Sequence, residues 1–130
     1  MSRPADACSL PDVLVAEPDV LLRRAVKQVA EEVGIARVYE TPDIHGAVRE
    51  MELRPFSALV IALDHEGDAF DLLTLLRCGQ YPSGASTPAA VLLRTGQEGA
   101  AVRLASLGVR ETLDGPHSVR RVLDLIGRLV

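Results

Sequence analysis

The chain has 130 residues, of which 48% are hydrophobic and 25% charged, and its formal net charge is −4. This length suits one compact domain, and the composition excludes an intrinsically disordered chain. No run approaches the roughly 20 consecutive apolar residues that a membrane-spanning helix needs. With 18 acidic residues against 14 basic ones and few aromatics, the chain is a poor candidate for nucleic-acid binding.

The first eleven residues are polar and lack the apolar core of a signal peptide. We therefore expect a flexible leader over residues 1–11, one folded domain over residues 12–130, and a cytoplasmic location. The two cysteines, Cys8 and Cys78, form no recognisable disulfide framework and are expected to be reduced.

Short apolar runs alternate with helix-periodic stretches along the rest of the chain. The runs predict strands at residues 13–16, 36–39, 58–62, 89–93 and 110–113. Three of them are continuously apolar, as expected of parallel strands that helices cover on both faces. The helix-periodic stretches predict helices at residues 22–33, 42–51, 68–77, 97–107 and from 118 onward.

Several residues mark where these helices begin and end. Gly34 follows the first helix at the position of a C-terminal cap. Thr41 and Pro42 predict a cap and a first helical residue for the second helix. Gly108 ends the fourth helix, and Ser118 begins the last.

Five strand–helix alternations predict an α/β fold with a doubly wound five-stranded parallel sheet and helices on both faces. In such sheets a site lies beyond the C-terminal ends of the strands. The segments expected at that edge are residues 17–19, 63–68, 94–95 and 114–116.

Across residues 12–130 the sequence resembles the receiver domains of bacterial two-component response regulators. Residues 13–24, VLVAEPDVLLRR, are similar to the first strand, acidic pocket and first helix of that family. Residues 107–116, LGVRETLDGP, are similar to its fifth strand and the turn that follows. The resemblance implies a flavodoxin-like, receiver-type sheet with strand order 2-1-3-4-5 and a role in two-component signalling or a phosphorelay.

The residues that carry the phosphorylation chemistry of that family are missing at the matching positions. The metal-binding pair of acids is matched by Glu17 and Pro18, and the phosphoacceptor aspartate by Ala62. The lysine before the proline after the fifth strand is matched by Gly115, ahead of Pro116. A methyl group cannot attack a phosphoryl group, and a proline ring carries no carboxylate for a metal.

Two further positions depart from the family. The hydroxyl residue that closes the fourth strand is matched by Leu93, or by Arg94 if the register shifts by one. The aromatic switch residue of the fifth strand is matched by Thr112. We therefore expect no catalysis, no bound metal and no cofactor.

Acidic residues gather at the same edge of the predicted sheet: Glu17, Asp19, Asp64, Glu66 and Asp68. One interpretation is a metal cluster. The simpler one is that Asp19 and Asp68 cap helices and that Glu66 is solvated.

We interpret the chain as a pseudo-receiver, a phosphorylation-independent protein-interaction module with a vestigial acceptor pocket. The pocket residues are expected to be Glu17, Pro18, Ala62, Asp64, Leu93, Gly115 and Pro116. Two alternatives stay open. In the first, the chain is an active receiver phosphorylated at Asp64, two residues beyond the matched position. In the second, it is a flavodoxin-like module that binds a small molecule.

Charge is distributed unevenly, with eight acids and two bases in residues 40–71 but six arginines and four acids in residues 94–130. Arginine is favoured in protein interfaces, although a solvated basic face is the competing interpretation. We expect a protein partner, or a second copy of the chain, at the fourth helix, fifth strand and fifth helix. The contact residues would be Arg103, Arg110, Thr112, His117, Arg120 and Arg121. In a homodimer, Glu111 and Asp124 would neutralise these arginines across the two-fold axis.

Overall fold

The computed structural model describes residues 10–64 and 66–130, and its five strands form one parallel sheet. The strands are β1 (Asp12–Ala16), β2 (Arg37–Thr41), β3 (Ala58–Ala62), β4 (Ala89–Leu93) and β5 (Glu111–Asp114). Their order across the sheet is β2-β1-β3-β4-β5, which confirms the predicted topology. Each strand lies within a few residues of its predicted position, and the apolar runs mark β1, β3 and β4 most clearly.

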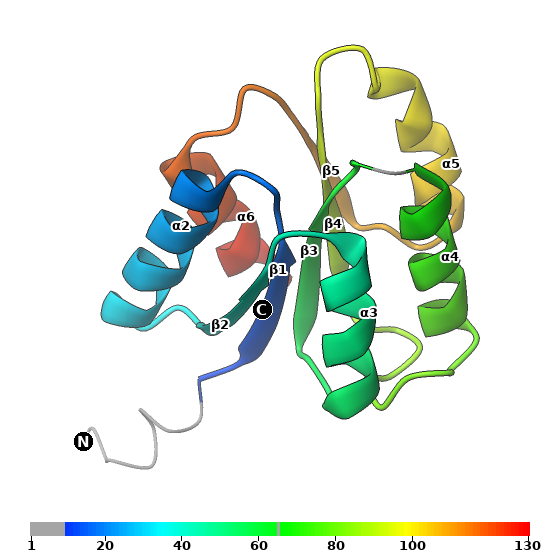
Figure 1. Ribbon diagram of the computed structural model, residues 1–130, viewed down its shortest axis with the longest axis horizontal. Helices are drawn as coiled ribbons and strands as arrows, with labels where there is room; N and C mark the ends of the chain where they lie inside the picture. Colours follow the sequence, from blue (N-terminus) through cyan, green and yellow to red (C-terminus); the bar gives the residue numbers. More distant parts are fainter. Residues whose placement is uncertain (1–9, 65) are drawn as a thin grey trace.

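Helices cover both faces of this sheet, as Figure 1 shows. They are α2 (Val20–Glu32), α3 (Ile44–Leu53), α4 (Glu66–Arg77), α5 (Ala101–Ser106) and α6 (Val119–Leu129), with a short 3-10 turn, η1 (Glu98–Ala100), before α5. On one face lie α2 and α6, and on the other lie α3, α4 and α5 (Figure 1). The doubly wound arrangement is therefore confirmed.

The core consists of two apolar clusters, one on each face of the sheet. All five residues of β3 are buried, and they alternate between the clusters. Ala58, Val60 and Ala62 pack on the side of α2 and α6, while Leu59 and Ile61 pack on the side of α3, α4 and α5. This two-sided burial explains why the central strands are continuously apolar.

The start of α3 differs from the prediction. Thr41 is the last residue of β2 and pairs with Ala16, so the predicted cap at Thr41 with Pro42 as first helical residue is wrong. Asp43 caps the helix instead, because its carboxylate accepts a hydrogen bond from the Gly46 amide at 2.8 Å. A Cβ atom on Gly46 would lie 1.8 Å from Thr41 Oγ1, so only glycine fits this close approach.

Of the two predicted aspartate caps, one is confirmed. Asp19 Oδ1 accepts hydrogen bonds from the amides of Leu21 and Leu22 at 3.1 and 3.2 Å, and α2 begins directly after it. Asp68 lies inside the first turn of α4, which begins at Glu66, so its prediction as a cap is wrong. Its charge still favours the helix N-terminus through the helix dipole.

Cys8 and all but the last two residues of the predicted leader lie outside the described residues. At the described end, the Pro11 carbonyl accepts a hydrogen bond from the Arg37 amide at 2.8 Å, which joins the chain before β1 to β2. Cys78 is an exposed free thiol after α4. Within residues 10–64 and 66–130, every helix is too short or too polar to cross a membrane.

Candidate functional site: a cavity at the C-terminal edge of the sheet

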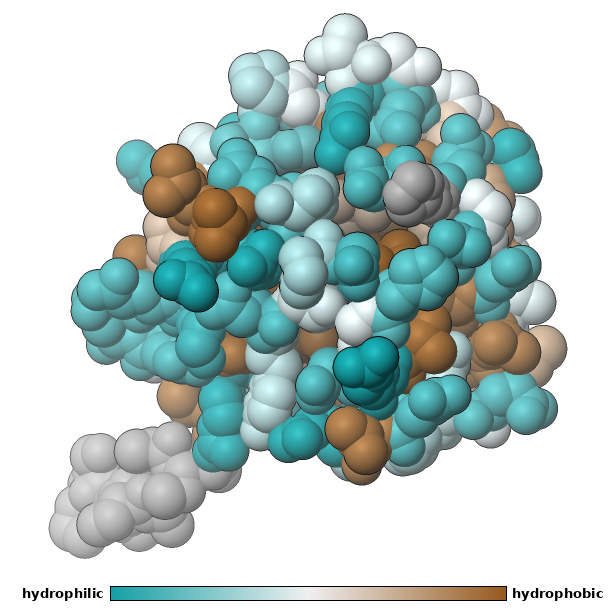
Figure 2. Space-filling view, viewed as in Figure 1, coloured by the Kyte–Doolittle hydropathy of each residue, from teal (hydrophilic) through white to brown (hydrophobic). Residues whose placement is uncertain are grey.

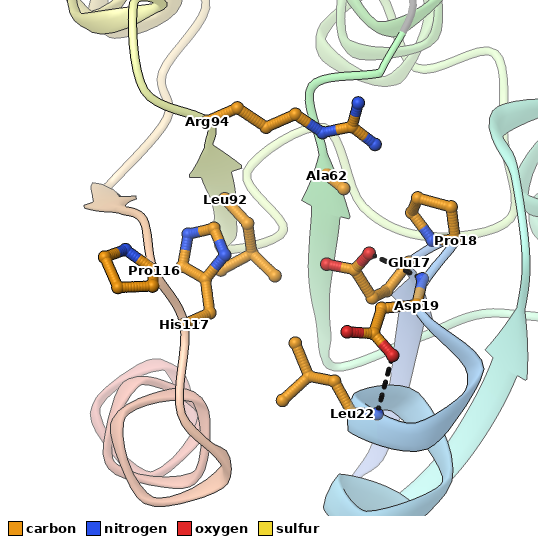
Figure 3. Close-up of a pocket in the computed structure, with 9 residues that line it drawn as sticks. All are labelled: Glu17, Pro18, Asp19, Leu22, Ala62, Leu92, Arg94, Pro116 and His117. Carbon is orange, nitrogen blue, oxygen red and sulfur yellow. Dashed lines mark hydrogen bonds between the residues drawn. The ribbon is translucent and has the colours of Figure 1, made fainter.

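A cavity of about 510 Å³ opens where the strands end, at the edge predicted for a site. Its lining comes from the ends of β3 and β4, from the segments after β1, β4 and β5, and from the first turn of α2 (Figure 3). The lining residues are Glu17, Pro18, Asp19, Leu22, Ala62, Leu92, Arg94, Pro116 and His117. Of the predicted pocket residues, Glu17, Pro18, Ala62 and Pro116 belong to it, and Asp64, Leu93 and Gly115 do not.

The acidic wall of the cavity is formed by Glu17 and Asp19. Glu17 follows β1, is only 6% exposed, and points its carboxylate into the cavity (Figure 3). Its Oε2 accepts a hydrogen bond from the Asp19 amide at 2.9 Å, while the Asp19 carboxylate caps α2. Between them, Pro18 presents only ring carbons. The second acid of this wall therefore stands one residue later than in the family pattern and serves the helix.

The floor of the cavity is apolar. Ala62, the last residue of β3, pairs in register with Leu92 of β4, and both side chains face the cavity. Neither side chain provides a nucleophile or a metal ligand, so the position matched to the phosphoacceptor has no side-chain oxygen.

Leu93 lies on the opposite face of the sheet from the cavity, so its placement in the pocket is wrong. Its side chain is fully buried in the cluster beneath α3, α4 and α5. Successive residues of a strand point to opposite faces, and the register with Ala62 places Leu92, not Leu93, in the cavity. No signal within the run of apolar residues in β4 distinguishes the two leucines.

Asp64 lies beyond the cavity lining and is engaged by Arg94. The two side chains form an ion pair with 2.7 Å between Arg94 Nη2 and Asp64 Oδ1. In Figure 3 the Arg94 side chain extends from the end of β4 across the space above Ala62. In the sequence Arg94 is only the alternative match to the hydroxyl residue that closes the fourth strand, and its ion pair was not predicted.

Gln97 strengthens the same link between the loops. Its Nε2 donates to the Leu63 carbonyl at 2.7 Å, and its Oε1 accepts from the Arg94 amide at 2.8 Å. The segments after β3 and β4 are thus joined by the ion pair and by the hydrogen bond from Gln97 to the Leu63 carbonyl, while the second Gln97 hydrogen bond orders the segment after β4 itself. Gln97 was also missed from sequence, because glutamine in a loop carries no pattern that names its partner.

The turn after β5 completes the cavity. The Gly115 amide donates to the Leu93 carbonyl at 2.9 Å, and the Gly115–Pro116 peptide bond is cis. The ring of His117 borders the cavity (Figure 3), and its Nε2 lies 2.8 Å from the Leu113 carbonyl. Because a carbonyl only accepts, Nε2 carries the proton and Nδ1 of the neutral ring remains an acceptor. His117 was predicted as a partner contact, and the structure places it in the cavity wall.

No three His, Cys, Asp or Glu side chains come together to hold a metal ion in the part of the chain that the structure describes. Glu66 pairs with Arg103, with 3.3 Å between Oε1 and Nη1. The acidic residues at this edge therefore have separate roles. Asp19 caps α2, Glu17 lines the cavity, and Asp64 and Glu66 each form an ion pair with an arginine.

Two of the predicted contact arginines are held by neighbouring elements. Arg103 of α5 lies over the ring of Phe70 at 4.3 Å as well as beside Glu66, so it joins α5 to α4. Arg121 of α6 donates to the carbonyls of Asp114 and Pro116 at 3.1 and 2.9 Å. Both side chains are exposed, yet both already have a structural role.

Two other arginines are available for a partner. The side chains of Arg110 and Arg120 are exposed and form no hydrogen bond or ion pair with any residue in the described ranges. Glu111 is the predicted counter-charge across a dimer axis. Its carboxylate instead accepts hydrogen bonds from two side-chain nitrogens of Arg128, at 2.7 and 3.0 Å. Thr112 lies half-buried in the middle of β5. The surface formed by α5, β5 and α6 therefore carries unpaired positive charge at Arg110 and Arg120.

Neither a protein-family model nor a curated protein matches the chain. Solved structures of receiver domains do match. The receiver domain of the Francisella response regulator 1452 has a TM-score of 0.75 and 22% identity, over 92% of this chain and 95% of that one. The non-phosphorylated HemR receiver domain from Leptospira biflexa has a TM-score of 0.76 and 22% identity, over 92% and 93%.

A third similar structure is the receiver domain of the sensor histidine kinase PA1611 from Pseudomonas aeruginosa, with a magnesium ion coordinated in its active site cleft. Its TM-score is 0.72 and its identity 17%, over 93% of this chain and 98% of that one. With nearly complete coverage in both directions, these matches show that the chain has the fold of response regulator receiver domains.

Proposed function

We propose that the chain is a receiver-like signalling module that acts through contacts with another protein and not through its own phosphorylation. One observation carries this proposal: the residue at the end of β3 that faces the cavity is Ala62. Transfer of a phosphoryl group to the chain needs a nucleophile at that point, and a methyl group has no electron pair to donate.

The surroundings of Ala62 support the same conclusion. Phosphoryl transfer depends on a metal ion and a fixed cation that neutralise the developing charge. In the PA1611 receiver domain a magnesium ion occupies the cleft. In this chain Pro18 has no carboxylate and the Asp19 carboxylate caps α2, so Glu17 provides the carboxylate that faces the cavity. Gly115 provides no cation. The cationic side chain above Ala62 is Arg94, which is paired with Asp64.

The alternative function, phosphorylation of the chain at Asp64, has less support than the proposed phosphorylation-independent function. The Asp64 carboxylate lies outside the cavity lining and forms an ion pair with Arg94. To act as a nucleophile it would have to leave Arg94 and move toward the cavity.

The surface formed by α5, β5 and α6 is the binding surface that we propose. It carries the unpaired arginines Arg110 and Arg120 on a chain with a net charge of −4. An acidic partner would neutralise these side chains, and such a complex would weaken with salt. Because Glu111 is already bound to Arg128, an acidic protein is a better match than a second copy of the chain.

The experiment that tests the proposal is phosphorylation by a small donor. The chain is incubated with acetyl phosphate and magnesium, quenched in acid, and its intact mass compared with the untreated chain. A phosphorylatable receiver domain treated in parallel serves as positive control. We expect no change in mass. An adduct of one phosphoryl group that disappears in Asp64→Asn would establish the active-receiver alternative and overturn the proposal.

A further inference from the structure

The cavity contains a buried carboxylate that the proposed function does not use. Glu17 is 6% exposed, and its carboxylate points into the space between the strand ends (Figure 3). Oε2 accepts one hydrogen bond, from the Asp19 amide, whereas Oε1 accepts none from any residue within the described ranges. A carboxylate oxygen that faces a cavity and has no partner within the protein is stabilised by a ligand with a hydrogen-bond donor or a positive charge.

The neighbouring cations are bound elsewhere. Arg94 is paired with Asp64 at 2.7 Å. Arg23, itself 9% exposed, pairs with Glu40 at 2.6 Å and donates to the backbone carbonyl of Glu17, not to its carboxylate. The Glu17 side chain therefore has no ion-pair partner in the described part of the chain.

Two further acceptors border the same cavity. Asp19 uses Oδ1 for the cap of α2, which leaves Oδ2 for a ligand. On the opposite wall, the ring of His117 presents Nδ1 as an acceptor, because Nε2 donates to the Leu113 carbonyl. The acceptors stand on two sides of the cavity, which suits a ligand with several N–H donors.

Apart from Arg94, whose charge is paired with Asp64, the rest of the lining is apolar. Leu22, Ala62, Leu92 and Pro116 cover the floor and sides, and the volume of about 510 Å³ lies in the range of small-molecule sites. Beside it, at the N-terminal end of α2, Val20 and Leu21 are 44% and 80% exposed. Figure 2 shows hydrophobic surface over this end of the molecule, at the upper left. One metal ion would leave most of this volume and all of its apolar surface unused.

We propose that the cavity binds a small organic cation, an alkylammonium or alkylguanidinium, with its charge against Glu17 and its alkyl chain against Leu22 and Leu92. The N–H groups would donate to Glu17 Oε1 and, depending on ligand length, to Asp19 or His117. This binding is independent of the proposed function, because its readout involves neither phosphorylation nor the surface of α5, β5 and α6.

The test is a titration of the isotope-labelled chain with n-butylammonium and n-butylguanidinium, followed through amide NMR shifts at constant pH and ionic strength. We expect saturable shifts at Asp19, Leu22, Ala62 and His117, with half-saturation at about 1–10 mM for ligands of this size. The neutral analogue n-butanol and the anion n-butyrate should give no saturable shift.

Glu17→Gln removes the charge but keeps an oxygen that can accept from the Asp19 amide, and it should weaken binding about tenfold or more. Glu32→Gln, at the exposed C-terminal end of α2, makes the same charge change and should bind as the unmodified chain does. Ala62→Leu fills the cavity without a change in charge and should abolish binding, so the proposal remains testable if Glu17→Gln fails to fold.

Four outcomes would overturn the proposal. They are the absence of saturable shifts with both cations, equal binding of n-butanol, unchanged binding in correctly folded Glu17→Gln or Ala62→Leu, and displacement of n-butylammonium by sub-millimolar magnesium. The last would identify the cavity as a metal site instead.

Discussion

Arg94 Nη2 and Asp64 Oδ1 lie 2.7 Å apart, and this ion pair joins the loop after β4 to the loop after β3. The Arg94 and Asp64 side chains are 56% and 27% exposed, so the pair itself contributes little to stability. Gln97, which bonds to the Arg94 amide and to the Leu63 carbonyl, is the more buried part of the link. Together these contacts hold the two loops in one arrangement above Ala62.

The first prediction concerns Gln97. Gln97→Ala leaves the Leu63 carbonyl and the Arg94 amide without their partners, so the free energy of unfolding should fall by about 1–2 kcal/mol. Amide hydrogen exchange at Arg94 should become faster, because the amide loses its acceptor. Denaturant unfolding and exchange measured by NMR check the two effects.

A matched control is available on α2. Gln28 donates to Glu32 in an exposed hydrogen bond, so Gln28→Ala should lower the free energy of unfolding by less than about 0.5 kcal/mol. Equal losses in the two variants would mean that Gln97 does not hold the loops.

The sequence predicts the order of strands and helices along the chain, but not the register between neighbouring strands. Three strands, β1, β3 and β4, are short apolar runs, two more mixed segments match β2 and β5, and the alternation of these segments with helical stretches predicts the doubly wound sheet. Within β4, however, Leu92 and Leu93 are both apolar and both at most 1% exposed. Only the register with β3 assigns Leu92 to the cavity, and a register between strands is a property of the folded chain.

The second prediction concerns Arg77, at the end of α4. Its guanidinium donates to four backbone carbonyls, those of Ala85, Thr87, Leu107 and Gly108, at 2.7–3.0 Å. Lysine has one nitrogen and cannot reproduce this fork, so Arg77→Lys should lower the free energy of unfolding by about 2–3 kcal/mol.

The control for Arg77 is Arg49→Lys. Arg49 is exposed on α3 and forms no hydrogen bond or ion pair within the described residues, so the change should alter stability by less than about 0.5 kcal/mol. Thermal and denaturant unfolding of both variants compare the two sites directly. A loss in Arg77→Lys no greater than in Arg49→Lys would contradict the assigned role.

The arginines also show what the sequence does not reveal. The basic excess of residues 94–130 predicts a positive surface, but not that Arg103 packs on Phe70 or that Arg121 binds two carbonyls. A long side chain reaches acceptors on elements that are distant in sequence, so its partner depends on the packing of those elements. Asp19, in contrast, was predicted as a cap because the amides that donate to its carboxylate lie within the next three residues.

The third prediction is a dependence of stability on pH through Glu31. Burial raises the pKa of Glu31, but hydrogen bonds from Lys27 and from the Val38 amide, with the charges of Lys27 and Arg37, hold it below its usual value of 4.5. A carboxyl with a lower pKa in the folded state stabilises the fold above the unfolded pKa, and this contribution disappears as the pH falls through the folded pKa.

Glu31→Gln should therefore lower the free energy of unfolding at neutral pH, by less than about 1 kcal/mol because the side chain is 36% exposed. Well below pH 4.5 the variant and the unmodified chain should become equally stable. Denaturant unfolding across this range checks the convergence. A stability difference that stays constant with pH, or that Glu32→Gln reproduces, would contradict the role of Glu31.

The last prediction concerns the proposed binding surface of α5, β5 and α6. Arg110→Glu combined with Arg120→Glu should abolish association with the partner and any self-association, because both side chains are exposed and unpaired within the described part of the chain. Arg121 is unsuitable for this test, since its guanidinium holds the turn after β5.

The double variant should keep its fold. Burial and, to a smaller extent, the charge of Arg110 lower the pKa of Arg77, which shows that these two guanidinium groups repel each other. A glutamate at position 110 replaces that repulsion with attraction, so the melting temperature should fall by no more than a few degrees. Sedimentation velocity and capture of partners from a lysate, each at low and high salt, measure association.

The matched control is Arg24→Glu combined with Arg49→Glu. These arginines are also exposed and unpaired among the described residues, but they lie on α2 and α3. The net charge changes equally in the two double variants, so a general electrostatic effect would weaken association in both. Arg23 cannot serve as a control, because it is buried against Glu40. If association persists in the Arg110 and Arg120 variant but fails in the control, the partner binds the surface of α2 and α3 instead.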